Sequence, residues 1–105
     1  MSTDRLEILK TMLAQNPQDS FARYGLAMEY SKRGELETAV REFQTLLEHN
    51  PDYAAAYFHA GQALEKLGRF ADARGFYEKG IEVTARSGDK HTQSELQAAL
   101  DMLPL

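Results

Sequence analysis

The chain has 105 residues, 43% of them hydrophobic and 27% charged, which suits one small globular domain with a modest core and argues against disorder. Its formal net charge of −4 disfavours a nucleic-acid partner held through its phosphates. Cysteine is absent, which excludes disulfides, thiolate metal sites and cysteine nucleophiles, and fits a reducing compartment.

The first expected element is a helix over residues 4–15. Its apolar positions share one face at the helical period, and they are Leu6, Leu9, Met12 and Leu13. Charges are interleaved with these residues, so the segment lacks the basic start and unbroken apolar run of a secretory signal. No stretch of the chain has the roughly 20 apolar residues that a membrane span needs. We therefore expect a cytoplasmic protein with no membrane partner.

An internal repeat of 34 residues follows this helix. Pro17 and Pro51 lie 34 positions apart, and so do Gly34 and Gly68. Several equivalent positions of residues 17–50 and 51–84 keep apolar or small side chains. A period of this length decides the architecture, because each repeat is one supersecondary unit that buries its apolar face against its neighbours.

Each repeat reads as two helices. In the first repeat, Asp19 or Ser20 caps a helix that runs to Lys32, and Gly34 closes it in the left-handed conformation that glycine tolerates. The later helices are expected over residues 36–49, 53–66, 70–84 and 90–103. The short turns between them make each pair antiparallel. We expect five helices and no strands.

The pattern resembles the tetratricopeptide repeat (TPR). The first helix of that family's unit carries a leucine, a small residue and a tyrosine, and a glycine follows at the turn. The second helix carries an alanine, an aromatic and a small residue, and a proline closes the unit. The first repeat matches through Leu26, Ala27, Tyr30, Gly34, Ala39, Phe43 and Pro51. The second matches through Tyr57, Gly61, Gly68, Ala73, Tyr77 and Gly80.

The resemblance implies an all-α fold, a right-handed superhelical stack of antiparallel helix pairs known as a TPR-like α-solenoid. It implies a single domain over residues 1–105, divided into an N-terminal half-repeat helix in 1–16, repeats over 17–50 and 51–84, and a C-terminal capping helix in 85–105. Two departures matter. Arg23 stands where the family has a large aromatic residue, and Ala85 stands where the next proline would fall. We expect the helix from residue 70 to continue a little beyond 84.

Gly61 raises a packing question, because a glycine inside a helix costs about 1 kcal/mol relative to alanine. The resemblance implies that Gly61 and Ala73 are small because the two helices of this repeat cross most closely there. Tyr57 and Tyr77 would fill the space beside the crossing. A large side chain at either small position should then destabilise the fold.

The resemblance also implies a concave groove lined by the first helix of each repeat, which in the family holds an extended peptide or a partner's helix. The expected partner-binding residues are Phe21, Tyr24, Met28, Lys32, Ala55, Phe58, Gln62 and Lys66. The aromatic and methionine side chains suit an apolar anchor, and the lysines suit a carboxylate or phosphate. Alternatives stay open here: the helix over 4–15 buries Phe21 and Tyr24, Met28 and Phe58 belong to the core, and the lysines are solvated surface charges.

Other chemistry lacks support in the sequence. The carboxylate clamp of relatives that bind chaperone C-termini is not expected, because Tyr24, Met28 and His59 occupy its positions. His59 lies beside the groove, either packed or facing a partner. His49, His59 and His91 are not spaced as metal ligands, and the chain has no GxGxxG and no phosphate loop. We expect no enzyme activity, no metal and no cofactor.

The expected function is that of a non-catalytic protein–protein interaction module, or scaffold, that binds a peptide segment or helix of unknown identity in the concave groove. An alternative is a structural or assembly protein that forms a homo-oligomer through its groove and C-terminal helix. In that alternative, the docking residues are Leu100, Met102, Leu103 and Leu105. A third class, an enzyme or small-molecule sensor, has no supporting cluster of residues.

Overall fold

The computed structural model describes residues 4–104, and these residues form helices without strands. In chain order the helices are α1 (Arg5–Gln15), α2 (Ser20–Lys32), α3 (Leu36–His49), α4 (Ala54–Lys66), α5 (Phe70–Ser87) and α6 (Lys90–Asp101). The expected count of five helices is therefore wrong, since the described chain has six. Each of the two repeats contributes two helices and each flank contributes one, because a turn interrupts the chain at all five junctions.

Aspartate side chains begin three of the helices. Asp4 accepts a hydrogen bond from the backbone nitrogen of Leu6 at 3.0 Å, and Asp19 does the same for Ala22 at 3.0 Å. Asp89 accepts from the backbone nitrogen of Thr92 at 3.1 Å. Each carboxylate satisfies an N–H group that has no partner within its own helix. Of the two caps that the sequence left open for α2, Asp19 is the one that forms.

Glycines end the helices where the repeat pattern places them. Gly34 follows α2 with φ at 82°, the left-handed conformation predicted for it. In place of the proline that would end α5 at residue 85, the helix continues to Ser87 and stops at Gly88, whose φ is 78°. The predicted extension of this helix beyond residue 84 is confirmed.

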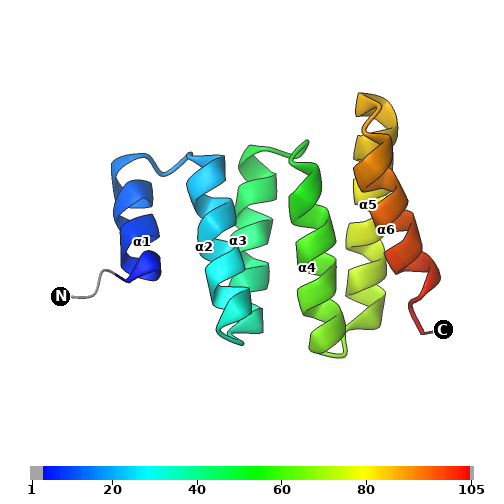
Figure 1. Ribbon diagram of the computed structural model, residues 1–105, viewed down its shortest axis with the longest axis horizontal. Helices are drawn as coiled ribbons and strands as arrows, with labels where there is room; N and C mark the ends of the chain where they lie inside the picture. The colour runs from blue at the N-terminus through cyan, green and yellow to red at the C-terminus, as the bar shows by residue number, and fades with distance from the viewer. Residues whose placement is uncertain (1–3, 105) are drawn as a thin grey trace.

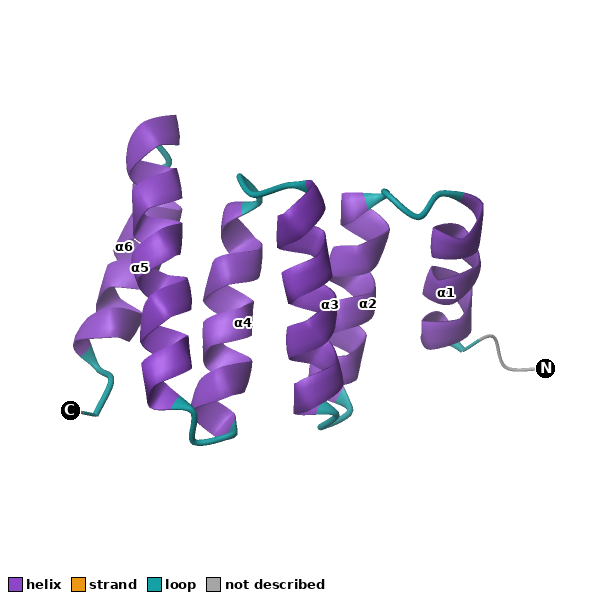
Figure 2. Cartoon of the chain, turned by 180° about the vertical axis from the view of Figure 1, so that it is seen from behind, coloured by secondary structure: helices purple, strands orange, loops and turns teal. Residues whose placement is uncertain are grey.

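The helices form two layers along a row that runs from α1 to α6 (Figure 1). Each helix packs against the next one in the chain, and in addition α2 contacts α4 and α4 contacts α6. In Figure 2, which views the molecule from behind, α3 lies in front of α2 and α5 in front of α6. The helices α3 and α5 make no contact with each other. The layer of α2, α4 and α6 is therefore closely packed, whereas α3 and α5 are spread apart.

Small residues let α4 and α5 cross closely. A Cβ atom built on Gly61 would lie within 2.8 Å of three ring carbons of Tyr77, which is itself fully buried. A Cβ on Gly80 would lie 2.8 Å from Cβ of Tyr57 and 2.9 Å from a methyl carbon of Leu96. Ala73 is also fully buried. The second repeat thus uses small residues where side chains of a neighbouring helix pass closely.

An ion pair replaces the large aromatic residue that the family has at position 23. Nη1 of Arg23 on α2 lies 2.6 Å from Oε1 of Glu42 on α3, and Nη2 donates to the carbonyl oxygen of Pro17 at 3.0 Å. The two charged side chains are only 17% and 23% exposed. The departure from the family pattern therefore still joins the two helices of the first repeat.

Candidate functional site

A hollow of about 280 Å³ lies on the face formed by α2 and α4. Its lining residues come from the two first helices of the repeats: Met28, Ser31, Lys32, Phe58, His59, Gln62 and Lys66. Five of the eight residues predicted to bind a partner are among them, because positions separated by the 34-residue period fall side by side on neighbouring helices. We call this hollow the α2–α4 groove.

Aromatic rings support the α2 side of the α2–α4 groove. The ring of Tyr24 is partly buried, with its centroid 5.2 Å from that of Tyr53 and 6.2 Å from that of Phe43. These rings lie on α2, on the residue that precedes α4, and on α3. Burial raises the pKa of Tyr24 above its usual value of 10.0. Tyr24 is thus held by the core and is not covered by α1.

The α4 side of the groove adds two further rings. The centroids of Phe58 and His59 are 5.2 Å apart in an edge-to-face arrangement, and the His59 ring is stacked on Phe43 at 6.5 Å. Burial lowers the pKa of His59 below 6.5, and the charge of Glu95 opposes this in part. His59 lines the groove and is also packed against these rings, whereas the sequence left open whether it is packed or faces a partner. Adjacent residues of a helix point in different directions, so the position of His59 next to Phe58 does not predict that both line the groove.

A hydrogen-bonded trio connects Gln62, which lines the groove, to Glu65 and to the buried Tyr77 of α5. Nε2 of Gln62 donates to the hydroxyl oxygen of Tyr77 at 2.8 Å, and the hydroxyl of Tyr77 in turn donates to Oε2 of Glu65. Nε2 of Gln62 also lies 3.4 Å from Oε2 of Glu65. Burial first, and then the hydrogen bond to Glu65, raise the pKa of Tyr77, so its hydroxyl stays protonated at neutral pH.

Lys32 and Lys66 stand at the ends of α2 and α4, one repeat apart, and both are exposed. Neither makes an ion pair with another residue of the described chain. Their ammonium groups therefore remain available to an acidic group of a partner.

Three of the eight predicted residues do not line the groove. Phe21 lies in the first turn of α2 with 74% of its surface exposed, so α1 does not bury it. Ala55 lies in the first turn of α4 and is partly buried. Tyr24 lies behind the lining, in the ring cluster described above. Phe21 lies about two helical turns before Met28 and Ala55 about one turn before Phe58, which periodicity alone does not reveal.

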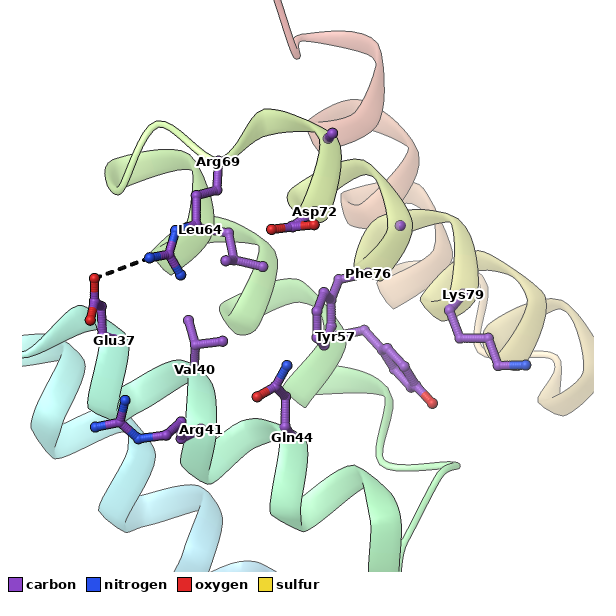
Figure 3. A pocket seen from close by; sticks show the side chains of 12 residues that line it. Glu37, Val40, Arg41, Gln44, Tyr57, Leu64, Arg69, Asp72, Phe76 and Lys79 are labelled. Carbon is purple, nitrogen blue, oxygen red and sulfur yellow. Dashed lines mark hydrogen bonds and ion pairs between the residues drawn. The ribbon is translucent and has the colours of Figure 1, made fainter.

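A larger hollow, of about 560 Å³, opens on the other layer between α3 and α5 (Figure 3). Val40, Leu64 and Phe76 form its apolar part, and the ion pair of Glu37 with Arg69, 3.1 Å long, spans one end. No residue pattern in the sequence indicates this hollow, because it arises from the separation of α3 and α5. Size alone does not make it the better site: it lacks the cluster of five rings that backs the α2–α4 groove.

Other kinds of site find no support among residues 4–104. No group of three or more His, Asp and Glu side chains gathers there in a way that could hold a metal ion. Over the same range, every helix is either too short or too polar to cross a bilayer.

Three comparisons place the chain among known proteins. The tetratricopeptide repeat family model matches residues 24–89. A TPR repeat-containing protein of Pseudomonas aeruginosa is 33% identical over 98 residues, which are 93% of each chain. The crystal structure of a tetratricopeptide repeat domain protein from Salinibacter ruber is 41% identical, with a TM-score of 0.73 over 78% of this chain and 91% of that one.

A more distant solved structure shares the fold alone. PcrH, solved in complex with the chaperone binding region of PopD, has a TM-score of 0.86 over 91% of this chain and 73% of that one, at 16% identity. The repeat period, the small residues at the helix crossings and the matches to family and relatives agree. The chain belongs to the tetratricopeptide repeat family.

Proposed function

We propose that the protein is a non-catalytic interaction module that binds a peptide segment or helix of another protein in the α2–α4 groove. The observation that carries the proposal is the composition of this groove. Rings from α2, α3 and α4 back a hollow whose rim holds two lysines without internal partners. A pocket with aromatic anchors and a polar rim is the usual form of a binding site that depends on a few side chains.

The arrangement of the layers supports the choice of face. Because α2, α4 and α6 touch while α3 and α5 are spread apart, a stack built this way curves toward α2, α4 and α6. We propose that this curvature is the right-handed superhelix of the family, with residues 1–105 as one domain and the groove on its concave side. PcrH supports the function, since it was solved with a bound region of PopD.

The proposed contacts divide by chemistry. Met28 and Phe58 take an apolar side chain of the partner, with Tyr24 as support behind them. Lys32 and Lys66 bind carboxylates or phosphates, and Gln62 hydrogen-bonds the partner's backbone. Phe21 extends the apolar surface to the first turn of α2, where it is free to contact a longer partner.

A selection experiment tests this function. A 12-residue random peptide library, displayed on phage, is selected on the wild-type protein, and the peptides obtained are measured against Phe58→Ala, Tyr24→Ala and Lys66→Ala. We expect each change to weaken binding, with Lys66→Ala as the variant least able to disturb folding because its side chain is exposed. Glu37→Ala, in the hollow between α3 and α5, serves as the control. Loss of binding in Glu37→Ala, with the groove variants unaffected, would place the site on the other face.

Self-association remains a second candidate, favoured by one residue. Met102 directly follows α6 and is 83% exposed, so it is available to another copy. Leu103 is buried in the core of its own chain, and the expectation that it docks elsewhere is wrong. Leu105 lies outside the described residues. Sedimentation velocity at several concentrations decides the matter, because a stable homo-oligomer sediments faster than a monomer of 11.8 kDa and a reversible one changes its sedimentation coefficient with concentration.

A further inference from the structure

The hydrogen bonds among Gln62, Tyr77 and Glu65 determine which way the side-chain amide of Gln62 is turned. A carboxylate only accepts hydrogen bonds, so the hydroxyl proton of Tyr77 goes to Glu65. The hydroxyl oxygen of Tyr77 is then left to accept, and the group that donates to it is Nε2 of Gln62, at 2.8 Å. The amide oxygen of Gln62 must therefore point away from Tyr77.

We propose that Tyr77, a residue of α5 with no surface in the α2–α4 groove, is a positioning residue that holds the amide oxygen of Gln62 toward the groove as a fixed hydrogen-bond acceptor. The partner group it fits is a backbone N–H of an extended peptide segment, since the neighbouring lysines supply only donors. This inference rests on the proposed function of the groove, and it adds a residue and a direction of hydrogen bonding that the repeat pattern does not contain.

Burial keeps the acceptor fixed. The ring of Tyr77 is fully buried, with Gly61 against one face and the ring of Phe58 at a centroid distance of 6.3 Å. A ring in this setting cannot leave without opening the contact between α4 and α5. Its hydroxyl is thus presented at a constant place, and Gln62 loses less rotational freedom when a partner binds than a free glutamine would.

The first repeat supplies an internal comparison. The position equivalent to Tyr77 is Phe43, and the positions equivalent to Gln62 and Glu65 are Met28 and Ser31. The centroid of Phe43 lies 6.2 Å from that of Tyr24, and the centroid of Tyr77 lies 6.3 Å from that of Phe58, so the ring has the equivalent aromatic neighbour in both repeats. Packing alone is satisfied by phenylalanine. The hydroxyl is present only in the repeat whose groove residues can bond to it.

A first experiment needs no ligand. In ¹⁵N-labelled protein, the side-chain amide of Gln62 is followed by NMR in wild type, Tyr77→Phe and the matched control Tyr57→Phe. The hydroxyl of Tyr57 donates to the carbonyl oxygen of Pro51 at 2.6 Å, so this control also loses one tyrosine hydrogen bond, but away from the groove. We expect slow exchange of one Gln62 amide proton in wild type and in Tyr57→Phe. In Tyr77→Phe its exchange and shift move to those of the exposed Gln15. A Gln62 amide that already resembles Gln15 in wild type overturns the inference.

A second experiment uses the tightest peptide selected on wild type from the 12-residue phage library. We expect Tyr77→Phe to weaken its affinity about fivefold and Tyr57→Phe to leave it unchanged, although both lower the melting temperature. In a Gln62→Met background, Tyr77→Phe should weaken binding no further, because the acceptor it positions is already gone. Equal effects of Tyr77→Phe with and without Gln62 mean a purely structural role and overturn the inference. If no peptide is selected, the proposed function of the groove fails, while the NMR comparison still decides whether Tyr77 fixes Gln62.

Discussion

The ring of Tyr77 of α5 occupies the space beside Gly61 of α4, since any Cβ at position 61 would lie within 2.8 Å of three carbons of the tyrosine ring. The question that the sequence raises about a glycine inside a helix is answered by this ring. The helix gives up about 1 kcal/mol of intrinsic stability at Gly61 and gains the close packing of a fully buried aromatic side chain.

Enlarging residue 61 should destabilise the protein. Gly61→Ala forces a methyl group into the fully buried Tyr77 ring, and overpacking of this kind costs roughly 1–3 kcal/mol. We expect the melting temperature to fall by several degrees in thermal unfolding followed by circular dichroism, and Gly61→Leu to fall further or not to fold. A melting curve of Gly61→Ala identical to wild type would contradict this packing.

Gly75 offers the opposite prediction in a neighbouring helix. It lies inside α5, it is exposed, and a Cβ atom there would meet nothing within 4 Å. Gly75→Ala should therefore add about 1 kcal/mol of helix propensity without a clash and raise the melting temperature. The pair of variants separates the two effects, because the same chemical change is expected to act with opposite sign. A fall in the melting temperature of Gly75→Ala would mean that α5 needs a glycine for a reason other than space.

The ion pair of Arg23 with Glu42 should contribute measurably to stability, unlike a typical surface pair. Its atoms lie 2.6 Å apart and both side chains are largely buried, so water screens the pair weakly. In a double-mutant cycle of Arg23→Met and Glu42→Gln, measured by urea unfolding, we expect a coupling energy of about 1 kcal/mol. Arg86 and Asp52, 3.6 Å apart and 64% and 77% exposed, form the control and should couple by less than about 0.5 kcal/mol. Equal coupling in both cycles would refute the distinction.

Stability should fall as the pH decreases from 7 to 5 because of His59. Burial lowers its pKa in the folded protein below 6.5, so the unfolded chain binds a proton first and stability is lost as the pH falls through this range. The slope for one such group is at most about 1.4 kcal/mol per pH unit. Asp4 and Asp89, whose pKa values are lowered, act only below about pH 3.8.

The check for His59 is the free energy of unfolding in urea at half-unit pH steps, for wild type and His59→Gln. The glutamine variant should show a shallower decrease between pH 7 and 5, because it carries no titrating ring within the cluster of Tyr24, Phe43 and Phe58. Parallel curves for the two proteins would show that His59 is not responsible.

Much of the fold was predictable because the physical signals are local and repeated. A 34-residue period, glycines at the turns and an aspartate before α2 define helices whose ends match the prediction within a few residues. Gly61 was also predicted correctly as a point of close contact, and Ala73, expected at the same crossing, is fully buried. Counting the segments as five helices was an error, because the same turns divide the chain into six.

The site was predictable only in part, because periodicity tells which residues share a face but not what each side chain reaches. Met28 and Phe58 fall in the groove as predicted, whereas Phe21 lies about two turns outside it. The hydrogen bond that Gln62 donates to Tyr77 joins residues 15 positions apart on two helices, and no spacing rule predicts it. The hollow between α3 and α5 depends on how far two helices stand apart, which is a property of the assembled stack.

The position of α1 at the end of the row has a consequence for how the protein opens. Among the described helices α1 packs against α2 alone, whereas every interior helix is held from at least two sides. In a stack whose stability comes from contacts between neighbours, the helix with one neighbour detaches at the lowest free energy. Deuterium should therefore replace the amide protons of residues 9–15 well before those of α4, and a protease would make its first cuts in the turn around Pro17.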